Sequence, residues 1–275
     1  MNIHLSDNET CFLFKSKNGQ FDASPSQLAN RAYLYGDGIF ETMIFTGAEI
    51  RFGKQHISRA FKGCTTLNIE LNVEQAFQDV EQYLKEKFPG KILRVRWNIY
   101  RDSVGKYTPV SHHASESLIL EAFTYTPPQQ KSAFINKQFV VPNLPWSNCK
   151  TLNALVYVQA GISRKKAGMD EVILLEAKGN VCEAGASNLF WKKDGVFYSP
   201  CLTSSCIEGV GRTVVMEKLQ KKGYSVVEGE FKPSEIMKAD LVFTTNVTGI
   251  HYIEKINSTE FNIEPIEFIE TLFVI

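Results

Sequence analysis

Three charged residues combine reactive side chains with neighbours that suit covalent and acid–base chemistry. Lys150 lies in the run LPWSNCKTLNALVYV, where apolar residues on both sides should leave its amine partly desolvated. A desolvated amine keeps its lone pair available for attack on a carbonyl carbon. Glu183 follows in VCEAG, whose small residues would let a flat ring lie against the backbone. Arg59, in HISR, offers a cation to an anionic group.

Each of these residues also has an ordinary structural explanation. Most lysines are solvated surface charges, and a glutamate in a strand is usually exposed unless it has a partner. An arginine such as Arg59 commonly covers apolar surface on a solvated helix face. The aromatic residues Tyr33, Tyr35, Phe40 and Tyr107 can likewise be packing residues.

Two further segments offer backbone donors of the kind that a phosphate dianion needs. Val210 and Gly211, in IEGVGR, stand where a helix is expected to begin, and helix N-termini bind anions through free amides and the helix dipole. The second segment is TTNVTGI, which contains Asn246, Val247 and Thr248.

Hydrophobic periodicity indicates the elements that must position these residues. FLFKSKNGQF reads as a hairpin around Asn-Gly, and ETMIFTGAEIRF as a second hairpin. The apolar spacing then predicts helices over 57–67 and 73–88, with Asn72 and Gln75 as a capping box for the second. Strands are expected at 92–101 and 117–125, around a polar loop at 102–116.

The second half of the chain begins with an extended segment. VPNLPWSN contains two prolines, cannot be helical, and should deliver Lys150 on an extended chain before a helix that ends near Gly168. An antiparallel meander is expected over 171–200, followed by a helix at 211–222, strands at 224–231 and 241–245, and a short helix after Pro233. Antiparallel sheet with segregated helices predicts an α+β protein.

The amino-acid composition limits the classes of ligand that we expect this protein to bind. The chain has 275 residues, with 30 Lys+Arg against 30 Asp+Glu, so charge gives no reason to expect nucleic acid or an anionic membrane. We expect a small-molecule ligand. The N-terminus lacks a basic region followed by an apolar one, and no apolar run reaches membrane-spanning length, so the sequence predicts a cytoplasmic protein. The six cysteines show no CxxC pair, and we expect neither disulfides nor a metal.

Several of these runs, taken together and in order, resemble the signature of class IV aminotransferase-like enzymes of fold type IV. The resemblance is carried by NRAYLYGDGIFETM, HISR, CKTLN, AGMDEVILLEAKGNVCEAGASNLFW and LTSSCIEGVGR, and it covers most of the chain. This family uses pyridoxal 5'-phosphate (PLP) and includes branched-chain aminotransferases, D-amino acid aminotransferases and 4-amino-4-deoxychorismate lyases.

The resemblance implies a two-domain architecture and a role for each matching residue. We expect a smaller N-terminal α/β sandwich at 1–126, an interdomain segment at 127–148, and a larger, mainly antiparallel sheet or barrel at 149–275 that binds PLP. Lys150 would hold the cofactor as a Schiff base and move protons, and Glu183 would pair with the pyridine nitrogen. The remaining cofactor contacts would come from Arg59, Ser187, Asn188, Val210, Gly211, Asn246, Val247 and Thr248.

The resemblance also suggests a substrate and a partner. Arg101 sits where the family places an arginine near the substrate, and Tyr33 and Tyr107 are further candidates. SVGKYTP resembles the glycine-basic-tyrosine loop of the lyases, with Lys106 in place of an arginine, and the Arg-x-His carboxylate trap of D-amino acid aminotransferases is missing. Members are homodimers, so we expect a homodimer, with loop 102–116 reaching towards the neighbouring subunit.

The reaction itself is open between two classes. Leu155 stands where branched-chain enzymes usually have a tyrosine, whereas the pattern Lys150–Asn153 is shared by lyases and D-amino acid aminotransferases. We favour release of pyruvate from 4-amino-4-deoxychorismate to give 4-aminobenzoate, a step in folate synthesis, with Thr42 assisting the elimination. An aminotransferase for branched-chain or D-amino acids is the alternative, and a non-catalytic binding protein is a third reading that the intact set Arg59, Lys150 and Glu183 disfavours.

Overall fold

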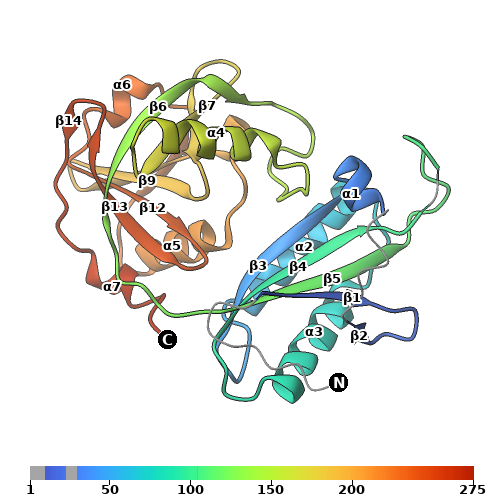
Figure 1. The fold of residues 1–275 in the computed structure, drawn as a ribbon. Helices are drawn as coiled ribbons and strands as arrows, with labels where there is room; N and C mark the ends of the chain where they lie inside the picture. The colour runs from blue at the N-terminus through green and yellow to red at the C-terminus, as the bar shows by residue number, and fades with distance from the viewer. Residues whose placement is uncertain (1–9, 23–29, 104) are drawn as a thin grey trace. The chain divides into compact units, whose positions relative to one another are not determined.

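The chain consists of two compact units, each with its own sheet. The structure, a computed structural model, describes residues 10–22, 30–103 and 105–275 (Figure 1). The first unit comprises the chain up to Thr124 together with Cys149–Asn153, and the second comprises Tyr125–Asn148 and Ala154–Ile275. Residues 149–153 therefore group with the first unit, although the sequence prediction began the larger domain at 149.

The first unit is an antiparallel sheet in the strand order β2-β1-β5-β4-β3, with two helices on one face (Figure 1). Its elements are β1 (Thr10–Lys15), β2 (Phe21–Asp22), α1 (Arg31–Tyr35), β3 (Gly38–Phe45), α2 (Gly53–Thr66), α3 (Val73–Lys87), β4 (Leu93–Arg101) and β5 (Ala114–Ala122). Alternation along β3 directs Ile39, Met43 and Phe45 into the core shared with α2 and α3. Phe40 and Thr42 therefore lie on the opposite face of the sheet.

The predicted helix 73–88 and its cap are confirmed in α3. The side chain of Asn72 accepts a hydrogen bond from the amide of Gln75 at 3.2 Å. Apolar residues at helical spacing, Val73, Phe77, Val80 and Leu84 among them, are buried against the sheet. The Gln75 side chain, however, turns to Asp79 at 2.9 Å, so the second half of the predicted capping box is replaced by a pair within the helix.

The second predicted hairpin, ETMIFTGAEIRF, is wrong in its second arm. After the turn, only Ile50 makes a bridge to Phe45. The amide of Arg51 still donates to Ile44 O at 2.9 Å, whereas the amide of Ile50 faces away from β3 and donates to the Glu81 side chain of α3 at 2.9 Å. Phe52 then adopts a left-handed conformation with φ 61° and turns the chain into α2.

The second unit is built on a longer sheet in the order β11-β10-β9-β12-β13-β6-β7-β8, with β14 paired to β13 (Figure 1). Its strands are β6 (Gln130–Val141), β7 (Glu171–Glu176), β8 (Val181–Ala184), β9 (Asn188–Lys193), β10 (Val196–Pro200), β11 (Val226–Gly229), β12 (Leu241–Asn246), β13 (Gly249–Ile256) and β14 (Thr259–Glu260). Its helices are α4 (Leu155–Lys166), the 3-10 turn η1 (Leu202–Ser204), α5 (Val210–Lys221), α6 (Pro233–Ile236) and α7 (Glu267–Glu270).

The predicted meander over 171–200 forms only in part. β7 pairs with β8 and β9 with β10, both antiparallel, but β8 and β9 are far apart in the strand order. Between them Ala184 donates to Ser187 O at 2.8 Å in a tight turn, and β9 continues to β12. Three pairs are parallel, those of β6 with β7, β6 with β13 and β10 with β11.

The fold is α+β and its larger sheet is mainly antiparallel, as predicted. Apolar residues of β7 and α4, such as Val172, Leu174 and Ala160, pack together with Val141 of β6. Within the described ranges, no helix has the length and apolar character required to cross a membrane.

Candidate active site

Lys150 is held by main-chain hydrogen bonds along β3, the edge strand of the first sheet. The amide of Phe40 donates to Lys150 O at 2.8 Å, and the amide of Leu152 donates to Gly38 O at 2.9 Å. Gly38 allows the neighbouring strand to approach, because a Cβ atom there would lie 2.4 Å from Ile99 O. The segment before Lys150 is not extended as predicted, because residues 145–148 form a turn in which the amide of Ser147 donates to Leu144 O at 3.0 Å. The chain then joins this sheet through an isolated bridge between Thr151 and Ile39.

The half-buried amine of Lys150 shares an aromatic ring with an arginine that sequence reasoning missed. Lys150 Nζ lies 4.4 Å from the centroid of the Phe40 ring, and Arg96 Cζ lies 3.6 Å from the same centroid. Both are cation–π contacts. Burial, with repulsion from Arg94 second, lowers the pKa of Arg96 to about 10, so its guanidinium is still charged at neutral pH. The alternation in RVRWNIYR would have placed Arg96 on this face.

Thr42 lies on the same face of the sheet, two residues beyond Phe40. The strand register sets Thr42 directly opposite Arg96 of β4. The threonine is half-buried. A hydroxyl, a guanidinium and the Lys150 amine are therefore carried by one face of the first unit.

Arg59 stands on α2, on the other face of the same sheet, in a buried network with Glu41 and His56. Arg59 Nε donates to Glu41 Oε1 at 2.8 Å, and Arg59 Nη2 donates to Glu41 Oε2 at 2.5 Å. His56 Nδ1 lies 2.6 Å from Glu41 Oε2, and the imidazole is fully buried. Arg59 is thus neither a free surface charge nor an apolar cover, but half of a buried ion pair.

The pKa values of Glu41 and His56 in this network are both lower than usual. Burial alone would raise the pKa of Glu41, but the charge of Arg59 and the hydrogen bonds from His56 and Arg59 outweigh it and lower the pKa from 4.5 to about 2. Burial lowers the pKa of His56 below 6.5, so the imidazole is neutral and donates its Nδ1 proton.

These shifts predict acid sensitivity of the first unit. Below pH 4.5 the unfolded chain protonates Glu41, whereas the folded chain holds it ionised down to about pH 2, so the stability it contributes declines as pH falls through that window. We expect urea unfolding of Glu41→Gln to depend less on pH between about 5 and 3 than that of the native chain. Equal pH slopes for the two proteins would contradict this assignment.

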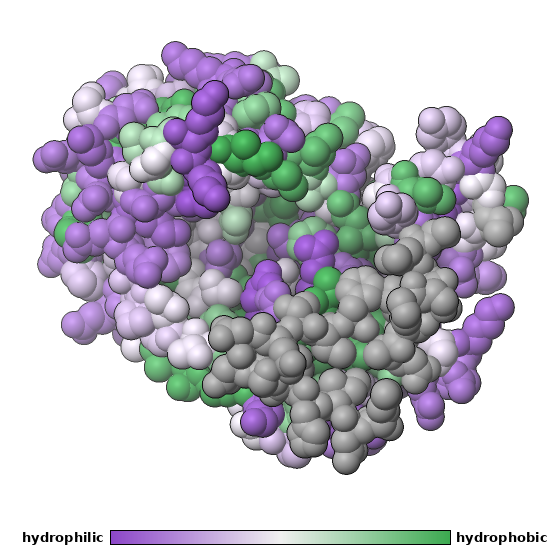
Figure 2. Space-filling view, viewed as in Figure 1, coloured by the Kyte–Doolittle hydropathy of each residue, from purple (hydrophilic) through white to green (hydrophobic). Residues whose placement is uncertain are grey.

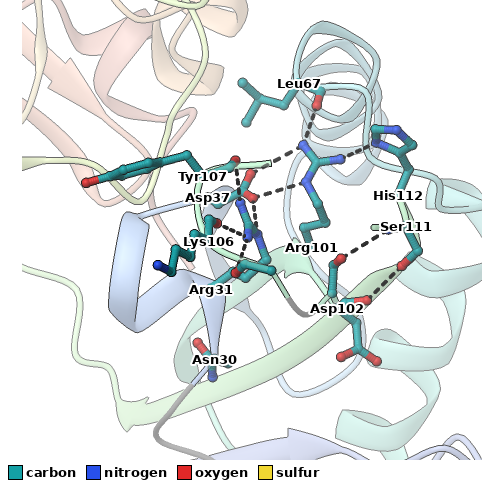
Figure 3. Close-up of polar contacts among 12 residues, drawn as sticks. Asn30, Arg31, Asp37, Leu67, Arg101, Asp102, Lys106, Tyr107, Ser111 and His112 are labelled. Atoms are coloured by element: carbon teal, nitrogen blue, oxygen red, sulfur yellow. Dashed lines mark hydrogen bonds and ion pairs between the residues drawn. The ribbon is translucent and has the colours of Figure 1, made fainter. Parts of the chain in front are cut away.

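A second polar cluster organises the loop after β4 (Figure 3). Asp37 accepts from Arg31 Nε at 2.7 Å and from Arg101 Nε at 3.0 Å. Burial opposes its ionisation, but the hydrogen bonds and charges of the two arginines outweigh burial and hold the pKa of Asp37 below its usual value. Arg101 also donates to Leu67 O at 2.7 Å and Asn68 O at 2.8 Å, so its guanidinium is saturated by the first unit itself.

Arg31 holds the loop through main-chain oxygens. It donates to Gly105 O at 3.3 Å, Lys106 O at 2.7 Å and Tyr107 O at 3.3 Å, and in Figure 3 the side chains of Lys106 and Tyr107 extend away from the cluster. Tyr107 is 87% exposed and Tyr33 is 75% exposed. The Tyr35 ring lies 5.7 Å from the Tyr107 ring. The predicted substrate residues Tyr33 and Tyr107 are thus exposed, and the loop that carries Tyr107 is fixed by Arg31.

The substrate role predicted for Arg101 can be separated from a structural one. Because Arg101 is buried and bonded throughout, we expect Arg101→Ala to lower the free energy of unfolding by about 3 kcal/mol. Arg94→Ala is the matched control, since Arg94 lies on the same strand in a half-exposed pair with Glu121 and should cost under about 1 kcal/mol. A raised KM with unchanged urea unfolding would instead support direct substrate binding by Arg101.

Glu183 is a buried carboxylate on β8 of the second unit. It is 3% exposed, its Oε1 accepts from the hydroxyl of Tyr157 at 2.6 Å, and its Oε2 accepts from the amide of Ile207 at 3.2 Å. Burial, followed by the charge and hydrogen bond of Glu183, raises the pKa of Tyr157, so the tyrosine stays a donor. Sequence reasoning missed Tyr157, because only the folded second unit brings α4 to β8.

The amides at the start of α5 lie against the turn between β12 and β13. A Cβ on Gly211 would stand 2.6 Å from Asn246 O, so glycine is needed for this approach. Asn246 Oδ1 accepts from the amide and the hydroxyl of Thr248, at 2.8 and 2.6 Å, which fixes the turn. The helix start and the turn thus form a backbone cradle that includes Val210 and Val247, and the free amides of a helix start are groups of the kind that bind phosphate.

Ser187 and Asn188 connect this cradle to β9. Asn246 Nδ2 donates to Ser187 Oγ at 3.1 Å. Asn188 Nδ2 donates to Ile207 O at 2.8 Å, and a Cβ on Gly209 would collide with Asn188 Oδ1 at 1.8 Å. Both predicted residues are therefore brought to the cradle as parts of its scaffold.

The predicted residues fall into two sets, one on each unit. The first unit carries Tyr33, Thr42, Arg59, Arg101, Tyr107 and Lys150. The second carries Glu183, Ser187, Asn188, Val210, Gly211, Asn246, Val247 and Thr248. Within the first, Lys150 and Thr42 lie on one face of the sheet and Arg59 on the other, and within the second, all but Glu183 belong to the cradle.

The comparison with known families defines the class, that of the PLP-dependent enzymes of fold type IV. The chain belongs to the amino-transferase class IV family, whose model matches residues 38–256. It is 26% identical over 228 residues to the D-alanine aminotransferase of Bacillus licheniformis, covering 81% of this chain and 79% of that protein. It is also 26% identical over 254 residues to the aminodeoxychorismate lyase of Vibrio harveyi, covering 86% and 89%.

A solved structure shows the same fold. The TM-score is 0.82 to an aminotransferase from Brucella abortus bound to the cofactor PLP, at 20% identity, with 95% of this chain and 97% of that chain covered. The structural likeness confirms the expected fold, and the family match confirms the expected family and its cofactor.

Proposed function

We propose that the chain is a 4-amino-4-deoxychorismate lyase, which releases pyruvate and leaves 4-aminobenzoate for folate synthesis. The observation that carries the proposal is the face of the first sheet on which Lys150, Arg96 and Thr42 lie around Phe40. It offers a base, a carboxylate partner and a hydroxyl for a leaving group. The similarity to the Vibrio harveyi lyase across most of both chains supports it.

Each unit carries residues suited to the cofactor. In the first unit, Lys150 would bind the aldehyde covalently and Arg59 would bind the phosphate. In the second unit, Glu183 would pair with the pyridine nitrogen, and the cradle of Gly211 and Asn246 offers amides to a phosphate. When bound, PLP supplies an electron sink that stabilises negative charge at the substrate α-carbon. Glu183, fixed by Tyr157 and the Ile207 amide, would keep the ring nitrogen protonated.

The sheet face would carry the proton transfers. The Lys150 amine would take the proton from the substrate α-carbon. Arg96, charged and half-buried, pairs with a substrate carboxylate. Thr42, opposite Arg96, donates a hydrogen bond to the departing enol oxygen of pyruvate. Arg101 then serves to fix the loop that displays Tyr107.

A direct comparison of products tests the reaction. Purified holoenzyme is incubated with 4-amino-4-deoxychorismate, and pyruvate is measured with a coupled dehydrogenase. In parallel, the enzyme receives 2-oxoglutarate with D-alanine or L-leucine, and glutamate is measured. We expect pyruvate and 4-aminobenzoate in equal amounts. Transamination without any pyruvate release would reject the lyase.

Transamination of a D-amino acid is the second candidate. The similarity to the Bacillus licheniformis D-alanine aminotransferase favours it, at an identity equal to that of the lyase relative. The same Lys150 would take the same proton, and the two reactions would differ in where that proton is returned. Thr42→Val discriminates, because it should slow elimination and leave transamination unchanged.

We also propose that the chain is a homodimer. Leu155, Val158 and Ile162 form an apolar stripe on α4 that is more than half exposed, and Figure 2 shows apolar side chains at the surface over this helix. Exposed apolar patches mark interaction surfaces. Light scattering should give about twice the mass of 31.1 kDa, and a fully active monomer would reject the proposal.

A further inference from the structure

Among the residues that the structure describes, Glu41 holds the guanidinium of Arg59 by one edge. Its Nε and Nη2 atoms donate to the two oxygens of Glu41, at 2.8 and 2.5 Å. A guanidinium has five N–H donors in a fixed plane, so this grip occupies one edge and leaves the edge formed by Nη1 and the outer Nη2 proton directed away from Glu41. The arginine side chain is 10% exposed and the glutamate side chain 1% exposed, so the pair is fixed within the unit.

Two elements make this grip rigid. Alternation along β3 turns Glu41 towards α2, and helical spacing brings His56 and Arg59 to one side of α2. His56 Nδ1 binds the same Glu41 oxygen at 2.6 Å as Arg59 Nη2 does. Glu41 thus also has a hydrogen bond to the neutral, buried imidazole of His56. This second bond holds the carboxylate in place if the arginine side chain moves.

The net charge of this network and the fixed orientation of its guanidinium predict opposite effects on anion binding when Glu41 is neutralised. His56 is neutral and the charges of Glu41 and Arg59 cancel, so the network attracts an anion through directed donors and not through net charge. Removing the charge of Glu41 would strengthen anion binding if net charge dominated. It would weaken anion binding if the fixed direction of the guanidinium dominated, because a loosened arginine must be ordered again on binding.

We propose that Glu41, seated on His56, is a positioning residue for the cofactor phosphate: it holds Arg59 by one edge so that the other edge meets the phosphate already oriented. The inference rests on the proposed role of Arg59 as a phosphate ligand. Glu41 itself touches neither cofactor nor substrate in this assignment and acts through Arg59 alone.

The test measures how much the phosphate contributes to cofactor binding. Apo forms of the native chain and of Glu41→Gln are titrated with PLP and with pyridoxal, which lacks only the phosphate. The ratio of the two dissociation constants reports the phosphate contribution. Because pyridoxal also closes to an internal hemiacetal in water, only the change of this ratio between variants is interpreted.

We expect the preference for PLP over pyridoxal to fall about three- to tenfold in Glu41→Gln, which corresponds to immobilising one flexible side chain. Glu116→Gln is the matched control. Glu116 is a buried carboxylate of the same unit that accepts from Lys15 and from Trp97, each at 2.8 Å, and its variant should keep the native ratio. An unchanged or increased ratio in Glu41→Gln would overturn the proposal.

Two further variants keep the outcome interpretable. If Glu41→Gln does not fold, Glu41→Asp is titrated instead, since it keeps the charge but withdraws the carboxylate by one methylene, and the same fall is expected. Arg59→Gln separates the two proposals. An unchanged ratio in Arg59→Gln rejects Arg59 as the phosphate ligand, whereas a reduced ratio there together with a native ratio in Glu41→Gln rejects only the positioning role. In the double variant, Glu41→Gln should have no further effect.

Discussion

Lys150→Ala is expected to lose the visible absorption of the bound cofactor and to lower turnover by at least about 10³-fold. The amine is held beside Phe40 by main-chain bonds on both sides, so truncation removes the nucleophile while the segment keeps its backbone contacts with β3. Absorbance spectra and initial rates of the purified variant measure both effects. Borohydride should fix the cofactor to the native chain and not to the variant.

Lys166→Ala serves as the control, because Lys166 is an exposed lysine at the end of α4. It should retain colour and activity. If the Lys150 variant kept a covalently attached cofactor, peptide mapping after reduction would identify the true attachment point and the assignment of Lys150 would be abandoned.

Glu183→Gln is expected to lower kcat by about 10²–10³-fold while the cofactor remains attached to Lys150. The substitution keeps the size of the side chain and a carbonyl that can accept from Tyr157 or the Ile207 amide, but removes the charge that would protonate the ring nitrogen. Rates and the visible spectrum of the same sample separate loss of chemistry from loss of cofactor.

Glu176→Gln provides a matched comparison in the same unit. Glu176 is equally buried on β7, but the donors it has in the described part of the chain are the nearby backbone amides of Asn180 at 3.0 Å and Lys178 at 2.8 Å. Its variant should lose stability without a specific loss of kcat. Similar kcat values for the two variants would argue that Glu183 has only a structural role.

Features that depend on neighbouring residues, such as helices and their caps, could be predicted from the sequence. The apolar spacing of 73–88 and the Asn72 cap predicted the helix α3, whereas the two prolines before Lys150 excluded a helix but did not predict the turn that forms at 145–148. The ordered motifs identified the family because several of them occur at matching spacings. Glycines such as Gly211 and Gly209 were part of a motif whose structural reason, close backbone approach, emerges only from the fold.

Long-range pairing determined what the sequence could not predict. The residues next to Arg101 in the chain do not predict its partners. These partners are Asp37, Leu67 and Asn68. The parallel pairing of β6 with β13 joins segments more than a hundred residues apart, and the contact between Tyr157 and Glu183 depends on the packing of α4. The alternation of β4 predicts that Arg96 lies on the same face of the sheet as Phe40 and Thr42, whereas the resemblance points to Arg101.

Arg31 fixes its loop through main-chain atoms rather than through the side chains that the loop exposes. All three of its loop contacts end on carbonyl oxygens, which every amino acid possesses, so the identities of residues 106 and 107 do not enter the bond that fixes them. Exchanging those two side chains therefore alters the surface offered to a ligand and spares the tether beneath it. Such modularity makes this turn the natural place to randomise when a new preference is sought in the laboratory.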